Sequence, residues 1–107
     1  MSETWTSRGT FLVLLALQQG PKHGYEISTY LKGRTAGFFS ISFGALYPIL
    51  HRLEKDGLVK GAWEDVGSAK RKKVYALTAK GRRALDGERD RYEATADAFA
   101  KLLGSKA

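Results

Sequence analysis

The stretch from residue 43 to residue 59, FGALYPILHRLEKDGLV, constrains the fold of this chain more than any other segment. Three of its leucines follow at intervals of four and three residues, so they share one face of a helix: Leu46, Leu50 and Leu53. Ser42 can accept a hydrogen bond from the free N–H groups at the start of this helix, and Gly57 can adopt the left-handed conformation that ends one. A basic hairpin is expected next. Together these features predict a DNA-recognition helix that leads into a β-wing.

Pro48 falls inside this predicted helix. A proline in a helix interior removes one backbone hydrogen bond and costs about 3 kcal/mol in a regular helix. The apolar spacing nevertheless continues on both sides of it. We therefore predict a local kink after the first turn and no break in the helix.

The other segments predict helices followed by a hairpin. Gly20-Pro21 ends the apolar run near the N-terminus, and Thr78 is placed to cap a helix after the hairpin. Helices are expected at residues 4–17, 23–32, 42–55 and 79–103, and strands at residues 58–66 and 72–77. The predicted fold class is mainly α with a small β-hairpin. It consists of a winged helix-turn-helix at residues 1–78 and a long C-terminal dimerisation helix at residues 79–107.

The last predicted helix carries an apolar stripe that a winged helix alone does not need. Its members recur every seven residues: Leu85, Tyr92 and Phe99. This spacing is typical of a heptad seam, and a long helix has to bury such a stripe against a partner. A second copy of the chain is the simplest partner, so the stripe predicts a homodimer. The alternative is that the helix packs against the first helix of its own chain.

Positive charge is concentrated in the predicted hairpin. The chain has 18 Lys and Arg against 11 Asp and Glu, and residues 60–83 hold eight of the bases and two of the acids. A polyanion such as DNA suits this stretch, although a solvated surface is the alternative. In alternating strand geometry the basic residues at the hairpin tip cannot all face DNA. We expect contacts with phosphates or the minor groove from Lys70, Arg71 and Lys73.

The residue inventory argues against an enzyme and against a bound metal or cofactor. There is no cysteine, and the two histidines, His23 and His51, have no carboxylate pair at metal-ligand spacing. No phosphate-binding loop and no nucleophile elbow occur. The N-terminus lacks a signal-peptide pattern, and the apolar run at residues 11–17 is too short to cross a bilayer. We therefore expect a soluble cytoplasmic protein with no membrane partner.

Side chains near the start of a recognition helix reach base edges in the major groove. The candidates for DNA contact in and before this helix are Ser40, Ser42, Phe43, Ala45, Tyr47, His51 and Arg52. Arg52 can pair with guanine or hold a phosphate, and both serines can reach a phosphate. Three alternatives stay open: Tyr47 can be a core aromatic, His51 an exposed residue without a role, and the serines simple helix caps.

Three sequence blocks occur in the order and spacing of a known family. They are GPKHGYEI at residues 20–27, GALYPILHRLEKDGL at residues 44–58 and VYALTAKG at residues 74–81. In these blocks the chain resembles the PadR family of transcriptional regulators. Its short tail resembles the compact subfamily, which has a single C-terminal dimerisation helix. The chain departs from the family at Phe43, where proline is usual, and at Ala45, where Ser or Thr is usual.

The resemblance implies roles for further residues. It places Tyr47 at the phosphate backbone. Members of the compact subfamily that bind drugs hold flat aromatic ligands at the dimer interface, between aromatic side chains of the C-terminal helices. The residues expected at an effector site or at the dimer interface are Trp5, Phe11, Leu85, Tyr92, Ala96 and Phe99. The alternative is that these aromatic side chains only pack the core of the dimer.

The sequence therefore predicts a dimeric DNA-binding transcriptional regulator, a repressor that binds a palindromic operator in double-stranded DNA. A small aromatic or hydrophobic effector would relieve repression. One alternative is a basic protein that binds nucleic acid without sequence preference and without an effector. Another is a protein-interaction module whose basic hairpin meets an acidic partner.

Overall fold

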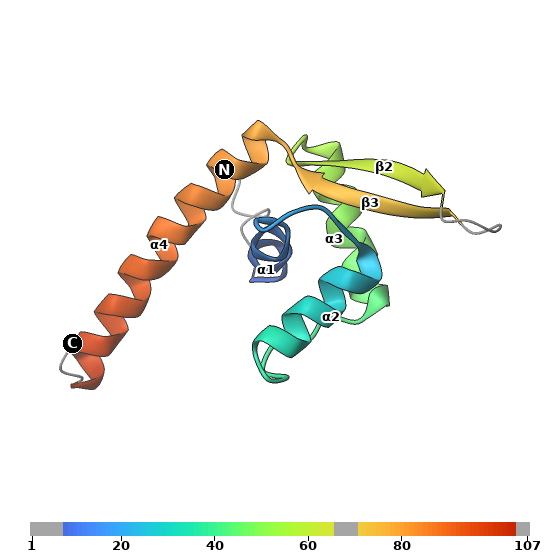
Figure 1. Ribbon diagram of the computed structural model, residues 1–107. Coiled ribbons are helices and arrows are strands. Elements are labelled where there is room, and N and C mark those ends of the chain that lie inside the picture. Colours follow the sequence, from blue (N-terminus) through green and yellow to red (C-terminus); the bar gives the residue numbers. More distant parts are fainter. Residues whose placement is uncertain (1–7, 66–70, 105–107) are drawn as a thin grey trace.

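The computed structural model of the chain describes residues 8–65 and 71–104. The elements follow in the order α1 (Arg8–Leu17), β1 (Lys22–His23), α2 (Gly24–Arg34), α3 (Phe43–Lys55), β2 (Val59–Asp65), β3 (Arg71–Leu77) and α4 (Ala79–Leu103). Figure 1 shows α1, α2 and α3 grouped together, with the β2–β3 hairpin and α4 extending from this group in different directions. The fold is a winged helix with a long C-terminal helix, which confirms the predicted fold class.

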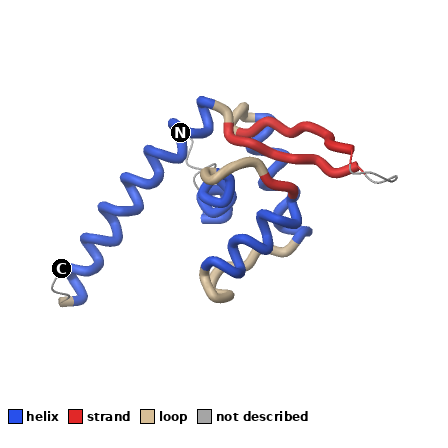
Figure 2. The backbone as a smooth tube through the Cα atoms, viewed as in Figure 1, coloured by secondary structure: helices blue, strands red, loops and turns tan. Residues whose placement is uncertain are grey.

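The core lies where α1, α2 and α3 meet, on the side of the sheet that faces them (Figure 2). The predicted apolar face of α3 is fully buried in it: Leu46, Leu50 and Leu53. Leu14 of α1 and Ile27 of α2 are fully buried in the same cluster. Burial of one such side chain stabilises the fold by about 1.5–3 kcal/mol. Packing of this face therefore holds α3 in place more firmly than its intrinsic helix propensity does.

Both ends of α3 form as the sequence predicts. The Oγ of Ser42 accepts a hydrogen bond from the N–H of Ala45 at 3.3 Å. Gly57 has a φ of +77°, and the N–H of the residue after it donates to the carbonyl of Leu53 at 2.9 Å. The helix continues through Pro48 without a break, because the buried face continues on both sides of the proline.

The sheet has three antiparallel strands in the order β1-β3-β2. Lys22 of β1 lies opposite Tyr75 of β3, and Val59 of β2 lies opposite Leu77. The sequence predicted β2 and β3 but not β1. A strand of two residues is too short to show an alternation of apolar and polar side chains in the sequence. It forms only because it pairs with β3. β1 leads directly into α2, so this pairing joins the start of α2 to the wing.

α4 packs closely on its own chain over its first half and is exposed over the second, where Tyr92 still contacts Phe11 of α1. Leu85 and Glu88 are buried, and Arg89 donates a hydrogen bond to Gln18 just beyond α1. From residue 91 to residue 99 every side chain is exposed. The radius of gyration is 15.4 Å, against about 13 Å for a compact chain of this length. The alternative of packing against the first helix of the same chain thus describes α4 only as far as Tyr92, and Phe99 lies beyond that contact with 60% of its side chain exposed.

The start of α4 is fastened to the end of α3. The hydroxyl of Thr78 donates to the carbonyl of Gly57 at 2.7 Å, and its N–H donates to the carbonyl of Leu58 at 3.1 Å. Nζ of Lys80 donates to the carbonyl of Asp56 at 3.0 Å. We call these three contacts the α3–α4 junction. Thr78 also caps α4 as predicted, since its Oγ1 accepts the N–H of the residue three positions on, at 3.0 Å.

Candidate nucleic-acid interface

The first turn of α3 and the residues before it form an exposed surface. All the residues predicted to contact DNA in and before α3 are exposed, including two in its third turn: Ser40, Ser42, Phe43, Ala45, Tyr47, His51 and Arg52. They alternate along the helix with the leucines that fill the core, so one face of α3 is buried and the other meets solvent. Nε of Arg52 lies 3.7 Å from a carboxylate oxygen of Asp56, one turn further on. Side chains in this position are the ones that a recognition helix brings to DNA.

Three exposed aromatic side chains meet at this end of α3. The ring centroid of Phe43 lies 6.0 Å from that of Tyr25 on α2 and 5.9 Å from that of Tyr47. We call these three residues the aromatic cluster. Tyr47 is 51% exposed, so it is a surface residue and not a core aromatic. Its hydroxyl reaches the start of α2, where a Cβ on Gly24 would lie only 3.1 Å from it.

The two described lysines of β3 have different surroundings. Lys72 is exposed. Nζ of Lys73 lies 3.0 Å from Oε1 of Glu54 on α3, and 5.4 Å from the ring centroid of Tyr75. The hydrogen bond that Lys73 donates to Glu54 raises the pKa of Lys73 above its ordinary value of 10.5. The structure thus pairs Lys73 with Glu54 on α3 while leaving 28% of its side chain exposed, and its contact with DNA stays a prediction.

Two other predicted contacts of the wing remain predictions. Lys70 lies outside the described residues. Arg71 begins β3 and pairs with Asp65 in the hairpin register. Between α3 and the wing lies a groove of about 470 Å³, whose lining includes Tyr47, Lys72 and Lys73. Both lysines therefore stand beside the aromatic cluster, Lys72 exposed and Lys73 paired with Glu54.

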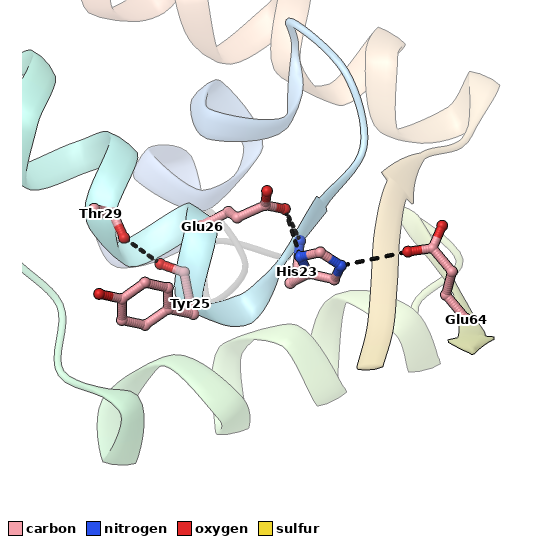
Figure 3. A network of polar contacts seen from close by, with 5 residues as sticks. All are labelled: His23, Tyr25, Glu26, Thr29 and Glu64. Carbon is pink, nitrogen blue, oxygen red and sulfur yellow. Dashed lines mark hydrogen bonds and ion pairs between the residues drawn. The ribbon is translucent and has the colours of Figure 1, made fainter. Parts of the chain in front are cut away.

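A polar network, shown in Figure 3, ties the start of α2 to the wing. The N–H of His23 donates to Oε1 of Glu26 at 2.8 Å, and the imidazole Nδ1 lies 2.7 Å from the same oxygen. The imidazole Nε2 lies 3.5 Å from Oε1 of Glu64 on β2. The backbone hydrogen bond from His23 lowers the pKa of Glu26 below its ordinary value of 4.5. Sequence reasoning missed this network, because only the pairing of β1 with β3 brings His23 close to Glu64.

A second surface lies between α1 and α4, where a groove of about 850 Å³ is lined by both helices and by the turn at residues 38–39. We call it the α1–α4 groove. The ring centroids of Phe11 and Tyr92 lie 5.9 Å apart within it. Ala96 is exposed, and Phe99 is 60% exposed. Leu85, expected with them at an interface, is instead buried in the core of the single chain, and Trp5 lies outside the described residues.

Within residues 8–65 and 71–104, no helix is long and apolar enough to cross a membrane. In the same residues, no group of three or more His, Cys, Asp or Glu side chains is placed to hold a metal ion. The His23 network does not form such a group, because its two carboxylates approach different nitrogens of one ring.

The three-helix core, the exposed first turn of α3 and the adjoining hairpin define a winged-helix protein of the DNA-binding class. The chain belongs to the family described as the transcriptional regulator PadR-like family, which matches residues 13–87. This match includes the three sequence blocks that suggested the family, and it confirms the prediction. The proteins of this family that the chain resembles are transcriptional regulators and not enzymes.

Two relatives with assigned functions show how far the similarity extends. The chain is 31% identical over 75 residues to the negative transcriptional regulator PadR of Bacillus subtilis, which covers 70% of this chain and 41% of that protein. It is 36% identical over 72 residues to the transcriptional regulator Rv3488 of Mycobacterium tuberculosis, which covers 67% of this chain and 53% of that protein. The chain thus matches about half or less of the length of these regulators.

Solved structures match over more of the chain. A transcriptional regulator from Clostridium thermocellum superposes with a TM-score of 0.80 at 26% identity, covering 96% of this chain and 97% of that one. The long α4 is therefore included in the match. Bacillus subtilis PadR, crystallised in complex with operator DNA, superposes with a TM-score of 0.67 at 30% identity, covering 72% of this chain and 44% of that one.

Proposed function

We propose that this protein is a dimeric repressor that binds a palindromic operator in double-stranded DNA. In this proposal residues 1–78 bind DNA and residues 79–107 hold two copies together. The observation that carries it is the exposed first turn of α3, which stands beside the wing while its leucines fill the core. Repression is inferred from the similarity to Bacillus subtilis PadR, a negative transcriptional regulator that has been crystallised with operator DNA.

On the DNA side, each copy would place α3 in one major groove and its wing on the flanking backbone. The first turn of α3 would meet base edges, and Arg52 would meet a base or a phosphate about two turns later. Tyr47 and the two serines before and at the cap would contact phosphates, which fix the register but carry no sequence information. The wing would add phosphate contacts through Lys70, Arg71 and the exposed Lys72.

The second half of α4 supports the dimer. Three of its large apolar side chains and one alanine follow at intervals of four, three and four residues, so they form one stripe: Tyr92, Ala96, Phe99 and Leu103. Phe99 is 60% exposed and Leu103 is 82% exposed in the single chain. Full burial of one such side chain stabilises an assembly by about 1.5–3 kcal/mol. A second copy that presents the same stripe would cover both.

The α1–α4 groove supports an effector site. Its volume of about 850 Å³ lies within the usual range for small-molecule sites, about 300–1,000 Å³. Phe11 and Tyr92 lie side by side in it and offer ring surfaces to a flat aromatic molecule. A molecule bound here would change the angle between the two copies of α4, and with it the spacing of the two recognition helices. Tyr92→Ala should then change the response to a planar aromatic dye, and unchanged response and unchanged DNA affinity would contradict an effector at this groove.

DNA binding is tested with the duplex upstream of the gene for this protein and a scrambled duplex of equal length, at two salt concentrations. Tighter binding to the native duplex that persists at the higher salt supports a sequence-specific regulator. Equal and salt-sensitive binding to both duplexes supports a nonspecific nucleic-acid-binding protein instead. No binding to either duplex at low salt contradicts DNA binding and leaves the protein-interaction module.

The dimer is tested with Phe99→Glu, which puts a charge into the apolar stripe. Sedimentation should show the mass of two chains for the unaltered protein and of one chain for this variant. Ala94→Glu is the matched control, because residue 94 lies two positions from Tyr92 and so on the opposite face of α4. Loss of the dimer in both variants, or in neither, would contradict the proposed interface.

A further inference from the structure

The first turn of α3 has an apolar edge on its exposed side. Between the cap at Ser42 and the buried Leu46 stand Phe43, Gly44 and Ala45, and none of these three has a side chain that forms hydrogen bonds. The Oγ of Ser42 already accepts the N–H of Ala45 at 3.3 Å. Through their side chains, these three residues therefore cannot recognise the donors and acceptors of base edges. It has, however, an exposed aromatic ring and an exposed methyl group.

The ring of Phe43 is held in place by its neighbours. It lies between Tyr25, whose ring centroid is 6.0 Å away, and Tyr47, whose ring centroid is 5.9 Å away. It is 44% exposed, so part of the ring contacts the cluster and part faces outward. A side chain fixed in this way loses little conformational freedom on binding, and its outward edge can select among bases.

Thymine is the base that offers an apolar group in the major groove, its 5-methyl group. Adenine and cytosine would instead place an amino group against Phe43, and that group would lose its water without gaining a partner. We propose that Phe43, supported by Ala45, is a specificity-determining residue that recognises the 5-methyl group of a thymine in each half of the operator. This inference rests on the proposed DNA-binding function and adds the base that the first turn selects.

A matched variant can remove the ring and keep the helix. Phe43 is the first residue of α3, where proline is well tolerated because its missing N–H has no partner within the helix. Ser42 before it has a φ of −73° and a ψ of 160°, which is the extended conformation that a following proline requires. Phe43→Pro should therefore leave the fold unchanged. Phe43→Ala is a second variant that removes the same ring.

The experiment uses the full chain and duplexes that it enriches from a random-sequence pool. Each thymine of an enriched duplex is replaced in turn by uracil, which lacks only the 5-methyl group, and affinities are measured by fluorescence anisotropy. We expect one thymine in each half-site at which the unaltered protein loses about fourfold in affinity, the effect of one buried methyl group. Both Phe43 variants should bind the thymine and uracil duplexes equally at that position.

The outcomes distinguish failure of thymine recognition by Phe43 from failure of the proposed DNA-binding function. If a sequence is enriched but no uracil replacement weakens binding, thymine recognition is wrong and the proposed function stands. If uracil weakens the unaltered protein and both variants by the same factor, another residue recognises the methyl group and the role of Phe43 is wrong. If the pool yields no enriched sequence, both the thymine recognition and the sequence-specific regulator are wrong.

Discussion

Gly81→Ala is the substitution whose effect the structure predicts most sharply. Gly81 is buried in the first turn of α4, and a Cβ built on it would lie 2.0 Å from the carbonyl oxygen of Leu58. An ordinary contact between carbon and a carbonyl oxygen is about 3.3 Å or longer. The obstacle is backbone and cannot rotate away as a side chain would. The start of α4 must therefore move by about 1 Å or more relative to the residues that follow α3.

This movement would break the α3–α4 junction. Thr78, three positions earlier, and Lys80, next to the glycine, make its three hydrogen bonds, at 2.7, 3.1 and 3.0 Å. At about 1 kcal/mol each, their loss costs about 3 kcal/mol. The substitution also stabilises the helix by about 1 kcal/mol, because alanine has a higher helix propensity than glycine. The expected result is a net loss of about 2 kcal/mol in the free energy of unfolding, or about 10 °C in melting temperature.

The assay is thermal and urea unfolding followed by circular dichroism, at one fixed protein concentration because a dimer makes stability depend on concentration. Gly87→Ala is the control. Gly87 lies in the same helix, is exposed, and has nothing within 4 Å of a Cβ built on it. That variant should be more stable than the unaltered protein by about 0.5–1 kcal/mol. If Gly81→Ala is as stable as the unaltered protein, or both variants shift in the same direction, the junction does not constrain α4 as described.

The remaining predictions concern other single contacts. Thr78→Val removes both the helix cap and the hydroxyl donor to Gly57, so it should lower the free energy of unfolding by about 1–2 kcal/mol, and Thr78→Ser should recover most of that loss in urea titrations. Lys72→Gln should lower the log–log slope of DNA affinity against salt by about 0.9, whereas Lys73→Gln should change it less, because Lys73 is paired with Glu54; equal slopes would contradict this pairing. Burial raises the pKa of Tyr75 above its ordinary value of 10.0, so its contribution to stability is complete below pH 10.0 and is lost as the pH rises through the raised value. Tyr75→Phe should therefore reduce the fall in the urea midpoint between about pH 8 and about pH 11, and an unchanged fall would assign the alkaline sensitivity to another group.

The parts of the fold that depend on local chemistry could be predicted from the sequence. The buried face of α3 follows from the spacing of its leucines, and its two ends follow from Ser42 and Gly57. Thr78 fixes the start of α4 in the same way. β1 could not be predicted, because its two residues become a strand only through pairing with β3, which lies about fifty positions along the chain.

The surroundings of individual side chains were harder to predict. The alternation of β3 implied that its lysines face different sides, but the sequence does not show that Lys73 donates a hydrogen bond to Glu54 of α3.

The apolar stripe on α4 also could not be divided from the sequence into a part buried in the single chain and an exposed part. Leu85 and Phe99 belong to one heptad pattern, yet Leu85 is buried against the body of the chain and Phe99 is exposed beyond it. The difference depends on where α4 leaves the core, and a repeat along the sequence does not contain that information.

The α3–α4 junction bears on how dimerisation and DNA recognition would be connected. α4 begins only two residues after the hairpin ends, and its first turn is hydrogen-bonded to the residues that close α3. The end of the recognition helix and the start of the proposed dimerisation helix therefore belong to one packed unit. In the proposed dimer, a change in the angle between the two copies of α4 would move both recognition helices, because the junction leaves no free linker between them. A molecule in the α1–α4 groove, whose lining includes Tyr92 about halfway along α4, would act on that angle directly.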